Sequence, residues 1–115
     1  MTQCDFTSKT CKPCEGGVDP LGLDEAKQAL TDHQLEGWQL AEDGKMIFAS
    51  FDFDNYYQTM AFVNAVAFMA HREDHHPDLA VGYSKVVIYY QTHAIGGLSE
   101  NDLICAAKVN RLIRA

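Results

Sequence analysis

The chain has 115 residues, of which 47% are hydrophobic and 22% charged, and this length allows one domain with a modest core. Its formal net charge is −7, without a cluster of Lys and Arg, which argues against direct nucleic-acid binding because phosphate contacts need concentrated positive charge. No apolar run approaches the roughly 20 residues of a membrane helix, and the first residues lack the parts of a signal peptide. We therefore expect a cytoplasmic protein that does not bind membranes.

Residues 1–22 combine Cys, Pro and Gly without a periodic apolar face, so we interpret them as an irregular leader. Cys11 and Cys14 form a C-x2-C pair, which permits zinc binding, but the second pair that a structural zinc site normally supplies is absent. Cys4 and Cys105 stand apart from this pair. We expect a tight turn without metal in the leader and a small core residue at Cys105.

The next stretch predicts a short helix and a hairpin. Asp24 can cap the helix, whose apolar positions follow at helical spacing. Trp38 is expected to open a strand. The dipeptide Asp43-Gly44 lies between two β-rich stretches and is the strongest hairpin signal in the chain. The two predicted strands are residues 38–41 and 46–51.

A long helix follows the hairpin. Asn55, with Gln58 three residues later, resembles a capping box at its start. From Tyr56 to about His71 the helix is apolar on most of its circumference, so we expect it to be the buried central helix. Pro77 and the histidines before it should end the helix.

The last part of the chain predicts two more strands and a final helix. The strands are expected at residues 79–83 and 86–93, where β-branched and aromatic residues are frequent. A Gly-Gly pair then closes the second strand. Ser99-x-x-Asp102 is typical of a helix start, and apolar residues at helical spacing follow it.

The predicted order over residues 23–115 is helix, two strands, helix, two strands, helix. Two hairpins with intervening and terminal helices indicate an α+β fold of two layers, a four-stranded antiparallel sheet with helices packed on one face. The other sheet face and the edge strands then need a partner. We therefore expect a homodimer or homotetramer.

Three of the five histidines, His75, His76 and His93, fall within nineteen positions. Imidazole can both give and take a proton near neutrality, so this cluster suggests proton-transfer chemistry, although three histidines also permit a zinc site. Because His76 precedes a proline, its backbone should be extended, and the side chains of His75 and His76 should diverge. His93 is expected at a strand end, on one face with Tyr89 and Gln91.

The full pattern around these histidines resembles the pterin-4a-carbinolamine dehydratases, also called 4a-hydroxytetrahydrobiopterin dehydratases, and in particular their bacterial members. The match covers nearly the whole chain, more strongly from Trp38 onward. The motifs that carry it are His71-x3-His75-His76-Pro77-x5-Tyr83-x9-His93-x8-Asp102, Met60–Ala67, Thr92–Asp102 and the leader segment Cys11–Gly17.

The resemblance implies the same two-layer fold, assembled into dimers or tetramers. It implies a hydro-lyase that removes water from 4a-hydroxytetrahydrobiopterin to give quinonoid dihydropterin, without a metal or other cofactor. That product is reduced again for aromatic amino-acid hydroxylation, so the resemblance also implies a role in pterin recycling and a link to phenylalanine hydroxylase. Proteins of this fold also serve as transcriptional dimerisation cofactors and Rubisco assembly factors. A non-catalytic interaction module is therefore the alternative function.

On this pattern the catalytic residues are His75, His76 and His93. We expect His75 and His93 to transfer protons and His76 to bind the pterin. The leader contains none of these histidines, so it is expected to be dispensable for turnover.

Three further residues are expected to bind or orient the substrate. Asp102 fits a helix capping box, yet the family pattern places it at the active site, and both roles can hold if the capped carboxylate orients a histidine. His71 stands where the family pattern often carries Glu, and it can instead close its helix. Tyr83 fits an aromatic position of the pattern, although an aromatic residue in a strand is more often part of the core.

Overall fold

The computed structural model describes residues 9, 11, 19–32 and 35–114; Cys4, Cys14 and the second half of the predicted leader turn lie outside the described residues. The predicted α+β order is confirmed, with one additional short 3-10 turn, η2. In chain order the elements are α1 (Leu23–Asp32), β1 (Gln39–Leu40), β2 (Ile47–Asp52), α2 (Tyr56–Glu73), β3 (Asp78–Val81), β4 (Lys85–Tyr90), η2 (His93–Ile95) and α3 (Glu100–Arg114).

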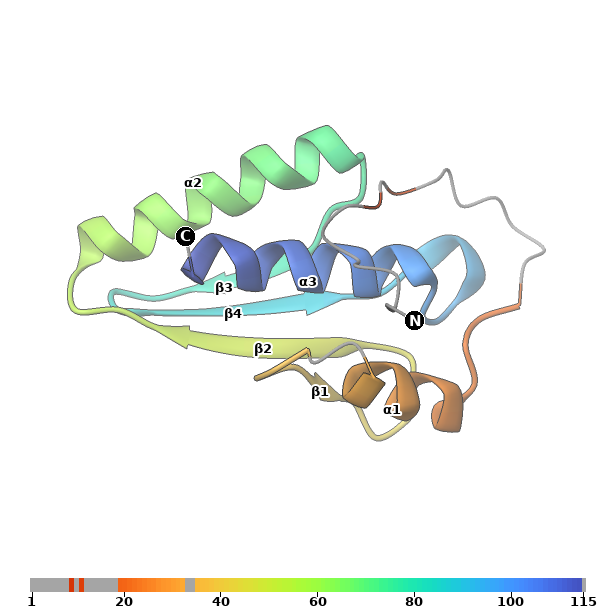
Figure 1. Cartoon of the computed structure of the whole chain (residues 1–115). Coiled ribbons are helices and arrows are strands. Elements are labelled where there is room, and N and C mark those ends of the chain that lie inside the picture. The colour runs from red at the N-terminus through yellow and green to blue at the C-terminus, as the bar shows by residue number, and fades with distance from the viewer. Residues whose placement is uncertain (1–8, 10, 12–18, 33–34, 115) are drawn as a thin grey trace.

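The four strands form one antiparallel sheet in the order β1-β2-β4-β3, so β2 and β4 are central (Figure 1). Residue Ile88 of β4 pairs with Ala49 of β2 on one side and with Leu79 of β3 on the other. Burial alternates along β4, where Val86, Ile88 and Tyr90 are buried and the residues between them are half-buried. This alternation gives the sheet one face that packs on the helices.

The most buried helix is α3 and not α2, so the prediction of a buried central helix at residues 56–71 is wrong. In Figure 1 α2 and α3 are neighbours, and α2 also packs directly on the sheet, since the ring centroids of Phe62 in α2 and Phe51 in β2 lie 5.0 Å apart. All six residues from Asn101 to Ala106 are buried, whereas Tyr57 and Phe68 of α2 are 87% and 64% exposed. Apolar side chains encircle α2, but one sheet can cover only one side of a helix, so the outer apolar side chains stay on the surface.

Side chains also cap the starts of α1 and α2. The Asn55 side chain accepts a hydrogen bond from the backbone N–H of Gln58 at 2.9 Å, which confirms the predicted cap of α2. Asp24 does not cap α1, because the helix already begins at Leu23. Instead the Glu25 carboxylate accepts the backbone N–H of Gly22 at 3.0 Å, which satisfies a donor just before the helix.

The hairpin predicted at Asp43-Gly44 is present, but its strands begin later than expected, so Trp38 precedes β1. Gly44 has a φ of 72°, a left-handed conformation that favours glycine, and its N–H donates to the Ala41 carbonyl. No helix in the part of the chain that the structure describes is long and apolar enough to cross a membrane.

Candidate active site

The end of α2 sets the position of the first two histidines. Asp74 adopts a left-handed conformation (φ 52°) after the last residue of α2, and its N–H donates to helix carbonyls. The next N–H, that of His75, donates to the Ala70 carbonyl at 3.3 Å. The chain therefore turns sharply at Asp74, and His75 is brought over the sheet while His76 leads into β3.

His75 is held between α3 and the sheet. Its imidazole stacks on the Tyr90 ring, with ring centroids 5.6 Å apart and 9° between the planes. Its Nε2 lies 2.7 Å from Oδ1 of Asp102, and only 12% of the His75 side chain is exposed. A stacked, hydrogen-bonded ring has little rotational freedom, so the structure fixes the orientation of this imidazole.

Asp102 is fully buried at the start of α3, and its second oxygen, Oδ2, accepts two hydrogen bonds. One comes from the Ser99 backbone N–H at 2.9 Å and the other from the Thr92 hydroxyl at 2.8 Å. The Thr92 hydroxyl also lies 2.7 Å from the Ser99 hydroxyl. Since the single Thr92 proton goes to Asp102, the Ser99 hydroxyl donates to Thr92. Asp102 thus caps α3 and contacts His75, so both of the roles considered for it are compatible with the structure.

These contacts determine the protonation of His75. A carboxylate only accepts hydrogen bonds, so Nε2 of His75 carries the proton that faces Asp102, and Nδ1 is the nitrogen that can exchange a proton with a ligand. Burial alone would lower the pKa of His75, but the hydrogen bond and the charge of Asp102 outweigh burial and raise the pKa. The imidazolium form of His75 is therefore favoured more than in a free histidine.

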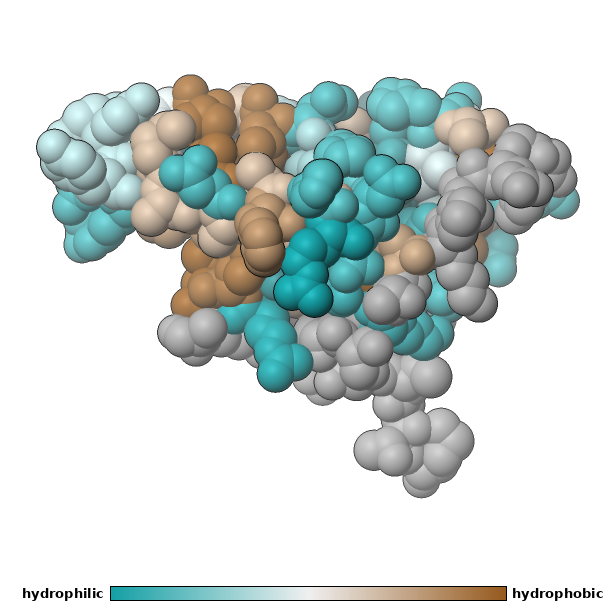
Figure 2. All heavy atoms as spheres, turned by 90° about the horizontal axis from the view of Figure 1, so that it is seen from above, coloured by the Kyte–Doolittle hydropathy of each residue, from teal (hydrophilic) through white to brown (hydrophobic). Residues whose placement is uncertain are grey.

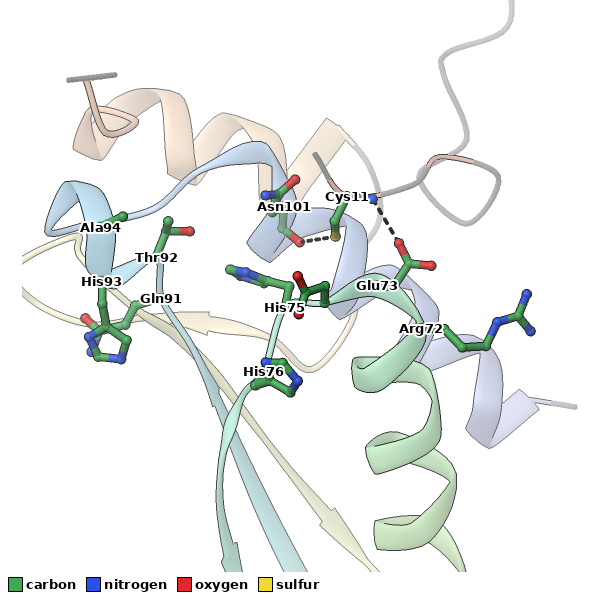
Figure 3. A pocket seen from close by; sticks show the side chains of 11 residues that line it. Cys11, Arg72, Glu73, His75, His76, Gln91, Thr92, His93, Ala94 and Asn101 are labelled. Carbon is green, nitrogen blue, oxygen red and sulfur yellow. Dashed lines mark hydrogen bonds between the residues drawn. The ribbon is translucent and has the colours of Figure 1, made fainter. Parts of the chain in front are cut away.

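His75 forms part of the wall of a cavity of about 650 Å³, which is within the usual size range of small-molecule sites. His76 and His93 form part of the same wall, so the structure brings the three predicted histidines together. The complete lining consists of Cys11, Arg72, Glu73, Asp74, His75, His76, Gln91, Thr92, His93, Ala94 and Asn101 (Figure 3).

His76 and His93 differ from His75 in exposure. Both are exposed, and Figure 3 shows the side chains of His75 and His76 pointing in different directions, as predicted from the proline that follows them. The predicted strand position of His93 is wrong: β4 ends at Tyr90, and His93 begins η2. The reason is a tight return of the chain, in which Thr92 pairs with Gly97.

The structure does not bring His71 and Tyr83 into this cavity. His71 is exposed in the last turn of α2 and is not part of the cavity wall. Tyr83 lies in the turn after β3, not in a strand, is 68% exposed, and stacks on Tyr56 at the start of α2. Because α2 runs from Tyr56 to Glu73, Tyr83 lies at the opposite end of this helix from His75.

Part of the leader contributes to the site, which the sequence did not indicate. The backbone N–H of Cys11 donates to the Glu73 carboxylate at 2.8 Å, and Lys108 of α3 contacts the other Glu73 oxygen at 2.6 Å. Burial would raise the pKa of Glu73, but these two donors lower it below its ordinary value. Glu73 therefore connects the leader, the end of α2 and α3 at the edge of the cavity.

Tyr90 and Thr92 also act at the site without having been predicted. Both residues lie just before His93 in the chain. Tyr90 contacts His75 and Thr92 contacts Asp102, and nothing in the local sequence spacing indicates either contact. Among the described residues, no group of three His, Cys, Asp or Glu side chains is arranged to hold a metal ion. Of the C-x2-C pair, Cys11 is described and Cys14 lies outside the described residues.

The fold and the site together define a small α+β domain with a buried histidine–aspartate pair beside two accessible histidines. Residues 19–112 match the family described as Pterin 4 alpha carbinolamine dehydratase. The chain belongs to this family.

Relatives cover almost the whole chain. A protein of Nitrosomonas europaea is 61% identical over 97% of this chain and 96% of its own length. A protein of Dechloromonas aromatica is 50% identical over the same shares, 97% of this chain and 96% of its own length. Both are provisionally named pterin-4-alpha-carbinolamine dehydratases.

Two solved structures share the fold. A transcriptional coactivator/pterin dehydratase from Brucella melitensis has a TM-score of 0.76 and 31% identity, covering 82% of this chain and 98% of its own. A pterin dehydratase-like protein, described as a RuBisCO assembly factor in the alpha-carboxysome, has a TM-score of 0.59 and 28% identity. The match covers 67% of this chain and 89% of that protein's chain.

Proposed function

We propose that this protein is a hydro-lyase that dehydrates 4a-hydroxytetrahydrobiopterin to quinonoid dihydropterin. The observation that carries the proposal is the His75–Asp102 pair, buried beside Tyr90 in a cavity that His76 and His93 also line. The reaction breaks the bond between C4a and the hydroxyl group, removes the proton from N5 and forms a double bond between C4a and N5. It therefore needs one proton donor and one proton acceptor.

His75 is suited to be the donor. Its raised pKa favours the imidazolium form, and Asp102 retains the Nε2 proton, so Nδ1 delivers its proton to the departing hydroxyl group, which leaves as water. After the transfer, His75 is a neutral imidazole whose Nε2–H still donates to Asp102. The ring need not rotate between the two states, which favours repeated proton transfer.

His93 is suited to accept the N5 proton, and His76 to bind the pterin. Both imidazoles are accessible at the cavity, and they come from different segments, η2 and the start of β3. Acid and base assistance of this kind accelerates a reaction by about 10²–10⁴-fold. In the organism, the product would then be reduced for aromatic amino-acid hydroxylation, which is the proposed link to phenylalanine hydroxylase.

The test is stopped-flow dehydration of freshly generated 4a-hydroxytetrahydropterin. The protein should exceed the spontaneous rate by at least about 10²-fold, and it should do so after treatment with a chelator. A rate equal to the spontaneous one contradicts the proposal. Loss of activity on chelation with recovery on adding zinc would show that a metal takes part, contrary to the proposed chemistry.

The second candidate function is a non-catalytic interaction module. It is favoured by the exposed apolar residues of α2, by the Brucella coactivator/pterin dehydratase and by the RuBisCO assembly factor of the same fold. A scaffold has no need of a buried, oriented His75–Asp102 pair, so we rank this function second. It becomes the first candidate if the dehydration assay fails.

A further inference from the structure

Two cysteines from distant parts of the chain meet behind the candidate active site. The Sγ atoms of Cys11 and Cys105 lie 3.5 Å apart, although 94 positions separate the two residues. Cys105 is fully buried in the second turn of α3, whereas Cys11 is half-buried and forms part of the cavity wall. Small oxidants that enter the cavity therefore reach Cys11 first, with Cys105 directly behind it.

Backbone contacts hold Cys11 in this position. Its N–H donates to the Glu73 carboxylate at 2.8 Å, and its thiol lies 3.7 Å from the Asn101 carbonyl of α3 (Figure 3). These contacts tie Cys11 to the end of α2 and the start of α3, beside the His75–Asp102 pair. The two sulfur atoms need to approach by about 1.5 Å to reach a disulfide length, which is a small movement for a residue outside helices and strands.

The surroundings of Cys105 favour its thiolate. The hydrogen bond from the Cys11 thiol lowers the pKa of Cys105 most, and burial opposes this, while the charge of protonated His75 and the nearby Tyr90 hydroxyl lower it further. The buried Tyr90 hydroxyl has no hydrogen-bond partner among the described residues, so a thiolate at Cys105 would give this hydroxyl an acceptor. A thiolate is the form of cysteine that attacks an oxidised sulfur.

We propose that Cys11 and Cys105 are a thiol oxidation site that takes a peroxide, or a low-molecular-weight disulfide, and closes into a disulfide joining the leader to α3. With a peroxide, the Cys11 sulfur attacks one oxygen while the Cys105 thiolate, 3.5 Å away, accepts the Cys11 proton and passes it to the departing oxygen; the O–O bond breaks, and a sulfenic acid and one water form. The Cys105 thiolate then attacks that sulfur, the S–S bond forms and hydroxide leaves, taking up the proton that Cys105 released. Two electrons pass from the sulfur atoms to the peroxide.

Simple packing is the competing explanation, because Cys105 belongs to the apolar core and Cys11 packs against it. Packing alone does not require a sulfur partner, and it predicts no covalent bond after mild oxidation. Oxidation would fasten Cys11 covalently to α3 in the cavity wall, and reduction would release it. In a reducing compartment such a bond is transient, so this site would respond to oxidative conditions.

The test uses the full chain, reduced and then treated with hydrogen peroxide or oxidised glutathione, with free thiols blocked before mass spectrometry. We expect a loss of two hydrogens and a disulfide between the tryptic peptides that contain Cys11 and Cys105. Cys14 lies in the same peptide as Cys11, so Cys14→Ser is the matched control. This variant should keep the link, while Cys11→Ser should lose it.

Thermal unfolding gives a second readout that is independent of dehydratase activity. A bond across 94 positions restricts the unfolded chain, so the oxidised Cys14→Ser protein should unfold at least about 5 °C above its reduced form. A disulfide between Cys11 and Cys14 in the unmodified chain, a link that survives Cys11→Ser, or no disulfide at all would overturn the proposal. A Cys11–Cys14 disulfide and the absence of any disulfide are both detected with the unmodified chain, so neither of these outcomes depends on the folding of a variant.

Discussion

At the scale of single residues, the His75–Asp102 contact explains why two adjacent histidines need not have the same task. His75 is enclosed by Tyr90 and Asp102, and only one of its nitrogens can exchange a proton with a ligand, whereas His76 is exposed. Neighbouring side chains of an extended backbone point to opposite sides. The same dipeptide thus supplies one oriented, largely buried imidazole and one accessible imidazole, which fits the proposed roles of His75 as acid and His76 as binding group.

Replacing the histidines one at a time separates these tasks. His75→Ala and His93→Ala should each lower turnover by about 10²-fold or more with little change in pterin affinity, because each removes a proton-transfer group. His76→Ala should weaken binding more than it slows the bound complex. The measurements are stopped-flow dehydration and, separately, binding of a stable pterin. Full activity in both His75→Ala and His93→Ala would contradict the proton-transfer assignment without affecting the fold.

Asp102→Asn tests the orienting role of the carboxylate. An amide at residue 102 cannot supply the negative charge that raises the pKa of His75, so this pKa should fall. The acid form of His75 is present below its pKa and is lost as the pH rises through it. The falling limb of the pH–rate profile should therefore move to lower pH, and turnover should drop at neutral pH. Asp24→Asn, the same substitution at an exposed residue of α1, serves as the control for solubility and folding. An unchanged profile in Asp102→Asn would contradict the orienting role.

At the scale of helices and strands, local patterns predicted most of the fold. The alternation in β4, the cap at Asn55 and the hairpin at Gly44 are local features, and all three are present. The side of α2 that is buried was not predictable. Apolar residues surround this helix, so its sequence does not indicate which side a neighbouring element covers. The position of His93 depends on the pairing of Thr92 with Gly97, which turns the chain back before the expected strand is complete.

The site shows the same limit. The spacing of the histidines suggested common proton-transfer chemistry, but the contacts of Tyr90 with His75 and of Cys11 with Glu73 are long-range contacts between different elements. Single-sequence spacing carries no information on such contacts. The leader in particular was expected to stand apart from the chemistry, whereas Cys11 lies in the cavity wall. Pro20 also packs closely on the segment after His93, where a Cβ atom at Gly97 would come within 2.7 Å of the Pro20 side chain.

Removal of residues 1–18 tests what the leader contributes. The truncation takes away Cys11 and its hydrogen bond to Glu73, but leaves the His75–Asp102 pair and both accessible histidines. We expect turnover of bound substrate to stay within about tenfold of the full chain, since the acid and base assistance remains, and pterin affinity to weaken because Cys11 is lost from the cavity wall. A folded truncation without turnover would show that the leader completes the catalytic machinery. Circular dichroism and pterin binding should be measured on the same preparation.

At the scale of the whole molecule, the outer surface of α2 leaves apolar side chains uncovered. Figure 2 looks onto the helical side of the molecule, and apolar side chains gather on part of it. Phe68 is 64% exposed, and a groove of about 510 Å³ runs beside it between α2 and α3, where Met69 and Leu112 contribute apolar lining. Exposed apolar surface of this kind marks an interaction site in soluble proteins.

The protein should therefore be a homodimer or homotetramer that buries this surface of α2. Apolar burial stabilises an interface by about 25 cal/mol per Å², so a charge at Phe68 should oppose association, and Phe68→Glu should weaken it by at least about tenfold. Thr31→Glu adds the same charge on the exposed side of α1 and should leave association unchanged. Light scattering at micromolar concentration measures the mass of all three proteins. A stable monomer for the unmodified chain would contradict the prediction. An oligomer that Phe68→Glu leaves intact would place the interface elsewhere, on the other sheet face or at the edge strand β3.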